Sequence, residues 1–175
     1  DHLGVIRIHT RLPLTSPEKI SGLLLDSLTT DKALFVVLHC NSHEEISEEV
    51  AGGFKRLLSR GIPLLSQSVL LKGVNDSEEL LEKLFRKLVS VRVKPYYLHH
   101  PDKAQGTSHF RVPMKKGIEM TKNLRGHLSG ICQPSYVLDI PGGFGKIPLG
   151  YHYIEEVDGF FEVEDWRGKI HKYQD

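Results

Sequence analysis

Strand-like and helix-like segments alternate along most of this 175-residue chain. Two continuous apolar runs, ALFVVLHC (33–40) and IPLLSQSVLL (62–71), are typical of strands that are covered on both faces. Between them, Val50, Phe54 and Leu57 recur at helical spacing. Repeated strand-then-helix units connect through right-handed crossovers, so they predict a parallel sheet. We expect strands at 4–10, 33–40, 62–71, 91–100 and 135–140, with helices between them and a helix at 114–128.

Three helix starts carry capping signals. Ser16 followed by Pro17 predicts a helix that begins there, because proline is favoured at the first helical position. Ser47 is expected to cap the next helix. Asp76 with Glu79 has the spacing of a capping box before a third helix.

The pattern changes after Gly150. Polar and apolar residues then alternate around two turn pairs, Asp158-Gly159 and Arg167-Gly168. We therefore expect two domains: residues 1–150 hold the strand–helix units, and residues 151–175 form a small β-meander.

Composition excludes some classes of function. The 39% hydrophobic and 26% charged content is that of an ordinary globular chain, and the net charge of +1 gives no reason to expect nucleic acid or a membrane surface as partner. No apolar run approaches the roughly 18 residues that a membrane helix requires.

The only cysteines, Cys40 and Cys132, form neither a disulfide framework nor a metal pattern, which favours a reducing cytoplasm. The chain opens directly on a strand-like segment, as expected of a fragment, and a homo-oligomer is compatible with this composition.

Polar residues gather where the expected strands end. His39, Gln67 and the 97–102 segment follow three strands, and Asp139 follows a fourth. Chemistry in parallel α/β folds is placed at the carboxyl ends of strands, so these residues are candidates for a site.

The run DIPGGFGK (139–146) places three glycines before Lys146. It lacks the spacing of a P-loop, and Pro148 excludes the helix that a dinucleotide-binding loop would open. One interpretation is a flexible turn with Lys146 in solvent. The other is a constrained lysine that forms a Schiff base with pyridoxal phosphate. Composition alone does not choose between them.

Longer strings carry a family resemblance. Together QSVLLKGVND (67–76), VKPYYLHHPD (93–102), GTSHFRVP (106–113) and LRGHLSGICQPSYVLDIPGGFGK (124–146) resemble the lysine 2,3-aminomutase family, whose members are radical S-adenosylmethionine enzymes that also use pyridoxal phosphate. The resemblance implies the C-terminal part of a partial (β/α)6 radical-SAM barrel, followed by the meander. It also implies an isomerase that converts α-lysine to β-lysine by a radical 1,2-amino shift.

The resemblance implies roles for five residues. Lys146 corresponds to the lysine that holds pyridoxal phosphate. Asp102 and Asp139 correspond to the carboxylates that bind the distal ammonium of substrate lysine, and two carboxylates at neighbouring strand ends would attract a cation. His39 and Gln67 correspond to positions that contact S-adenosylmethionine.

One family feature is missing. The [4Fe–4S] cluster requires a C-x-x-x-C-x-x-C run, and this sequence has none, so we expect no metal ligands in this chain and activity only together with a cluster-bearing N-terminal half. The cysteine-free tail is closer to the shorter relatives that form β-lysine for elongation factor P. Two alternatives stay open: an aminomutase of the same family with another amino acid substrate, and a half-barrel binding domain without catalysis.

Overall fold

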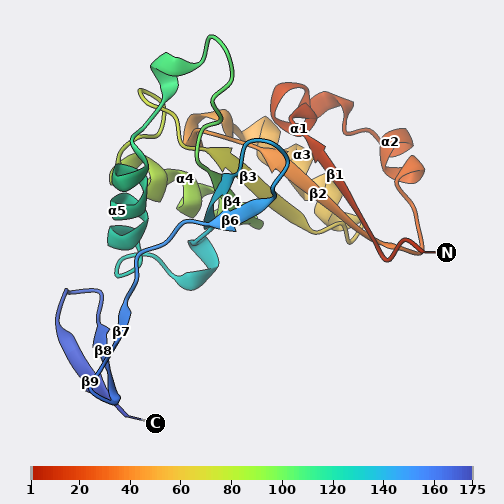
Figure 1. Cartoon of the computed structure of the whole chain (residues 1–175). Helices are drawn as coiled ribbons and strands as arrows, with labels where there is room; N and C mark the ends of the chain where they lie inside the picture. Colours follow the sequence, from red (N-terminus) through yellow and green to blue (C-terminus); the bar gives the residue numbers. More distant parts are fainter. Residues whose placement is uncertain (1, 175) are drawn as a thin grey trace.

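The structure, a computed structural model, describes residues 2–174 and contains a curled, half-barrel sheet (Figure 1). Its six strands lie in the order in which they occur along the chain. The first five are parallel, as predicted, and the sixth runs antiparallel to the fifth. The strands are β1 Val5–Thr10, β2 Ala33–His39, β3 Leu64–Val69, β4 Val93–His99, β5 Ser135–Asp139 and β6 Lys146–Pro148.

Three longer helices pack against this sheet (Figure 1): α3 Glu48–Ser59, α4 Glu78–Ser90 and α5 Met114–Leu124. None of the helices within residues 2–174 combines the length and the apolar character needed to cross a membrane. The shorter elements are α1 Leu12–Thr15, η1 Pro17–Lys19, α2 Gly22–Ser27, η2 His43–Glu45, η3 Ser108–Phe110 and η4 Gly130–Cys132.

One hydrophobic core joins the helices to the sheet. Phe54 of α3, Phe85 of α4 and Leu38 of β2 are each at most 1% exposed. Full burial of side chains of this size is worth about 1.5–3 kcal/mol each. This core orients the sheet, and with it the carboxyl ends of the strands.

The helix predicted from Ser16 begins where expected but is short: Ser16 is in the N-cap position of the 3-10 helix η1, which begins at Pro17 and ends at Lys19. Ser16 makes no side-chain capping bond, and the chain forms a short 3-10 turn before α2 begins after Ser21, whose hydroxyl accepts from the amide of Leu24. Arg56 of α3 donates hydrogen bonds to the carbonyl oxygens of Pro17 and Ile20. The Pro17 carbonyl also accepts from the Ile20 amide, so it takes part in the 3-10 helix and in the contact with Arg56.

The predicted cap residue of α3 is confirmed, whereas that of α4 is displaced by one residue. The Ser47 hydroxyl accepts from the amide of Val50, which confirms that prediction. For α4 the cap is Ser77, one residue later than predicted, because the Asp76 carboxylate instead accepts from the amide of Gly73 and so stabilises the preceding turn.

The predicted meander is present as an antiparallel sheet of β7 Ile154–Val157, β8 Phe160–Glu164 and β9 Ile170–Tyr173 (Figure 1). Asp158 and Gly159 form its first turn, both with positive φ. A side chain on Gly126 would collide with the Trp166 ring, and Lys122 of α5 forms an ion pair with Glu164. The division into domains 1–150 and 151–175 stays a prediction.

Candidate functional site

Lys146 and Asp139 are paired across β5 and β6. They are directly opposite each other in the antiparallel register, and the glycine-rich segment 140–145 connects them. Lys146 Nζ donates to both carboxylate oxygens of Asp139, at 2.5 and 2.6 Å. The sequence pattern predicts a turn or loop for this run and gives no sign of β6. Lys146 is therefore not extended into solvent; its side chain is 30% exposed and ion-paired.

His99, at the end of β4, contacts both partners. Its Nδ1 lies 2.9 Å from Asp139 Oδ2 and 3.3 Å from Lys146 Nζ. Its other nitrogen, Nε2, is buried and has no hydrogen-bond partner within residues 2–174. A buried polar atom without a partner is costly, so Nε2 marks a position where a ligand atom would be favoured.

Tyr97 completes this cluster of four. Its ring centroid lies 5.3 Å from Lys146 Nζ and 5.6 Å from the His99 ring. A β-bulge in the pairing of β3 with β4 places Tyr97, rather than Tyr96, opposite Gln67. Tyr97 and His99 are two residues apart on β4, so their side chains lie on the same face, and both are near Lys146.

The electrostatics of the cluster favour ionised Asp139. The hydrogen bond from Lys146 lowers the pKa of its carboxyl, burial opposes the shift, and the contact with His99 lowers the pKa further. The site thus presents a carboxylate that already holds a primary ammonium.

His39 and Gln67 form a second group with His9 of β1. Gln67 Nε2 lies 2.9 Å from His39 Nε2, and Gln67 Oε1 lies 2.9 Å from His9 Nδ1. Burial lowers the pKa of His39, and electrostatic repulsion from the neighbouring His9 and Arg11 side chains lowers it further. A neutral His39 ring can accept the Gln67 amide hydrogen, so the amide links the three strand ends.

Asp102 does not contact the Lys146–Asp139 pair. It is exposed in the loop between β4 and η3, and it makes no hydrogen bond or ion pair with any other residue that the structure describes. Of the two carboxylates expected to bind an ammonium, only Asp139 contacts Lys146.

Sequence reasoning did not assign a role to His99 or His9. Both follow the two-residue alternation of a strand: His99 is two residues beyond Tyr97, and His9 is at the equivalent end of β1. That alternation was a usable signal for His99. The Asp139–His99 contact itself depends on the pairing of β4 with β5 and was not visible in the sequence.

The cysteines do not contribute to the site. Cys40 and Cys132 are both buried, and burial raises the pKa of the Cys40 thiol to about 12. Within residues 2–174, no three His, Cys, Asp or Glu side chains are grouped so that they could hold a metal ion.

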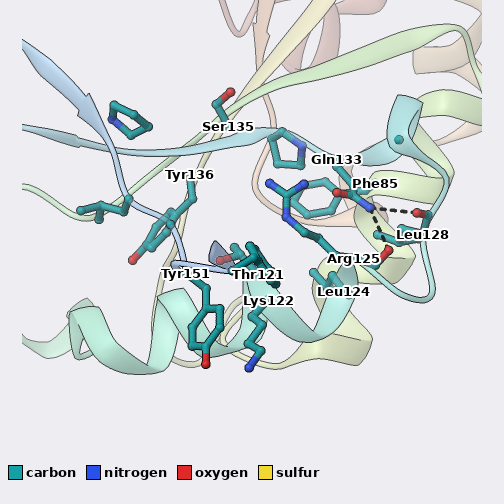
Figure 2. A pocket seen from close by; sticks show the side chains of 16 residues that line it. Phe85, Thr121, Lys122, Leu124, Arg125, Leu128, Gln133, Ser135, Tyr136 and Tyr151 are labelled. Atoms are coloured by element: carbon teal, nitrogen blue, oxygen red, sulfur yellow. Dashed lines mark hydrogen bonds between the residues drawn. The ribbon is translucent and has the colours of Figure 1, made fainter. Parts of the chain in front are cut away.

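Figure 2 shows the side chains that line a cavity of about 370 Å³. Ser135 and Tyr136, at the amino end of β5, line it together with Arg125 and Gln133. None of the five predicted site residues lines it. It therefore does not coincide with the cluster at the carboxyl end of β5.

Comparison with known proteins gives the family. Residues 121–173 match the family model described as Lysine-2,3-aminomutase. The L-lysine 2,3-aminomutase of Clostridium subterminale is 42% identical over 153 residues, which are 87% of this chain and 37% of that protein. That of Acetoanaerobium sticklandii is 44% identical over 153 residues, with the same coverage of 87% and 37%. The chain belongs to the lysine 2,3-aminomutase family.

Members of the family with different named substrates are similar to this chain. The glutamate 2,3-aminomutase of Clostridioides difficile is 32% identical over 175 residues, which are 99% of this chain and 42% of that protein. The chain spans 37% to 42% of the length of these three relatives.

Proposed function

We propose that this chain forms the amine-binding part of an aminomutase that converts α-lysine to β-lysine. The observation that carries the proposal is the Lys146–Asp139 pair, which His99 contacts from the adjacent strand. It combines an amine able to hold an aldehyde cofactor with a carboxylate able to bind an ammonium. Lysine is favoured over glutamate as the substrate because Asp139 would repel the side-chain carboxylate of glutamate. In addition, the two relatives named L-lysine 2,3-aminomutase are 42% and 44% identical to this chain, whereas the glutamate 2,3-aminomutase is 32% identical.

The residues present fit pyridoxal phosphate as the cofactor. Lys146 would hold it through its amine, the Tyr97 ring would lie against it, and the unpartnered His99 Nε2 would gain a polar neighbour. When bound, pyridoxal phosphate supplies a conjugated ring that carries the migrating nitrogen. Lys146 would also accept the cofactor back when product leaves.

His39 and Gln67 would contact S-adenosylmethionine. Their linked imidazole and amide are at neighbouring strand ends and offer both donors and acceptors. The residues present do not fit a [4Fe–4S] cluster, since no C-x-x-x-C-x-x-C run occurs and both cysteines are buried. The cluster ligands would therefore lie outside these 175 residues.

The half-barrel supports a partial radical-SAM barrel as the complete fold. Among the described strands, β1 pairs only with β2, and Val5 on β1 is 55% exposed. Its free edge is suited to the addition of further parallel strands. Asp102 would join Asp139 as a second ammonium ligand if the loop after β4 folded over the site.

The test is cofactor attachment to the purified chain. Pyridoxal phosphate is added at a limiting amount, the product is reduced with borohydride, and the labelled peptide is mapped by mass spectrometry. We expect the label on Lys146 and its loss in Lys146→Ala. Lys83→Ala is the matched control, because Lys83 is an exposed lysine on α4 whose loss should leave the label unchanged.

Label spread evenly over the exposed lysines, or absent from Lys146, would contradict the proposal. Specific label on Lys146, with lysine and glutamate equally unable to release it, would instead favour the binding domain without catalysis.

A further inference from the structure

In the structure the chain's own lysine occupies the ammonium site. Lys146 Nζ makes two hydrogen bonds to Asp139, lies 3.3 Å from His99 Nδ1, and faces the Tyr97 ring at 5.3 Å. The carboxylate and the aromatic face form a receptor for a primary ammonium, and His99, which donates from Nδ1 to Asp139, holds the carboxylate in position. Nothing in this geometry requires that the ammonium be attached to the chain.

We propose that Lys146 is the resting occupant of an ammonium site formed by Asp139, His99 and Tyr97, and that attachment of the cofactor to Lys146 vacates the site for the distal ammonium of the substrate. This inference rests on the proposed function for the identity of the second occupant. It adds an order to binding: the cofactor binds first and the amine substrate second.

Lys146 competes with a free amine for Asp139 because the chain holds it beside the carboxylate. Lys146 is directly across the strand pair from Asp139, so its ammonium is tethered within reach of the carboxylate. Tethering gives a group an effective concentration of the order of millimolar or higher, and a free amine must compete with it. The apparent affinity for the free amine falls in proportion to the fraction of sites that Lys146 leaves vacant.

Glycines with positive φ form the turn that precedes Lys146. Gly142, Gly143 and Gly145 have φ values of 93°, 80° and 96°, which residues with a β-carbon rarely adopt. These glycines let the chain reverse direction between β5 and β6, so that Lys146 comes to lie opposite Asp139.

The experiment is a titration of the cofactor-free chain with n-butylamine, followed by NMR of the His99 and Tyr97 rings. We expect Lys146→Ala to reach half-saturation at about fivefold lower amine concentration than the wild type, the size expected for loss of a partly exposed ion pair. Lys146→Met is a second variant that keeps the side-chain volume, in case the alanine variant folds poorly. n-Butanol, which lacks the charge, should not bind to either.

Lys83→Ala is again the matched control and should titrate as the wild type does. The double variant with Lys146→Ala and Asp139→Asn should lose the gain in affinity. Equal half-saturation for the wild type and both Lys146 variants would overturn the inference.

A second measurement tests the release of Lys146 from Asp139 before it reacts with the cofactor. The ion pair must break before Lys146 reacts with an aldehyde, so Asp139→Asn should accelerate pyridoxal phosphate labelling of Lys146 several-fold. Labelling of Lys146 at an unchanged rate would overturn the exchange but leave the proposed function intact. Absence of any Lys146 label would instead refute the proposed function itself.

Discussion

At the scale of single residues, Asp139 depends on Lys146 for its ionisation. The hydrogen bond from Lys146 is the largest cause that holds the pKa of the Asp139 carboxyl below 3.8, the value of an unperturbed aspartate. A carboxyl whose pKa is lower in the folded than in the unfolded state stabilises the fold above its unfolded pKa. That contribution is lost as the pH falls through the folded pKa.

We therefore expect Lys146→Ala to raise the pKa of Asp139 toward 3.8, as measured by NMR titration of its ¹³C-labelled carboxyl. Any loss of stability in the variant near neutral pH should disappear in acid, once Asp139 is protonated in both proteins. Asp165 is an internal control: His171 and two backbone amides hold its pKa at about 2, so the variant should not change it. A pKa of Asp139 that stays equally low in Lys146→Ala would show that Lys146 is not its main partner.

At the scale of elements, α5 and β5 approach closely because Gly117 has no side chain. A β-carbon on Gly117 would lie 2.1 Å from the Tyr136 hydroxyl and 3.0 Å from a methyl group of Leu70. Tyr136 is 3% exposed, and its hydroxyl is 2.7 Å from His100 Nδ1. The tyrosine therefore has little room to move.

We predict that Gly117→Ala lowers the free energy of unfolding by about 1–3 kcal/mol, the usual cost of overpacking a core. Chemical denaturation measures this change. Gly22→Ala on α2 is the control, because nothing lies within 4 Å of its β-carbon position, and its effect should be within about 0.5 kcal/mol. Equal effects of the two substitutions would show that the close approach of α5 to β5 is not maintained in solution.

The elements also show what could be read from the sequence. The five parallel strands and the meander were predictable, because apolar runs, alternation and turn pairs are local signals. The helix predicted from Ser16 is interrupted after Lys19, where Arg56, which lies 39 and 36 positions from Pro17 and Ile20, binds the carbonyls of that segment. β6 and the contacts of His99 were not predictable, since both depend on which strands become neighbours.

At the scale of the whole molecule, the small sheet is attached to the half-barrel at α5. Trp166, the only tryptophan, lies against Gly126, and Lys122 pairs with Glu164 at 2.7 Å. A β-carbon on Gly126 would lie 2.3 Å from the Trp166 ring. The side chain of Trp166 therefore reports whether the small sheet is docked.

We expect Gly126→Ala to displace Trp166 and so increase quenching of its fluorescence by acrylamide. Gly130→Ala, in the nearby η4 turn with open space around it, should leave the quenching unchanged. Unchanged quenching in Gly126→Ala would mean that the tryptophan is not held against this position. Borohydride labelling of Lys146 should be the same in both variants, because β6 lies in the larger sheet.

The register in which Asp139 pairs with Lys146 decides which face of the sheet carries the lysine side chain. The amide of Ile140 donates to the carbonyl of Gly145, which closes the connection between β5 and β6. Successive side chains of a strand point to opposite faces, so a slip of β6 by one residue along β5 would turn Lys146 to the other face of the sheet. A change of length between 140 and 145 that causes such a slip should therefore remove the amine from the site while the strands remain paired.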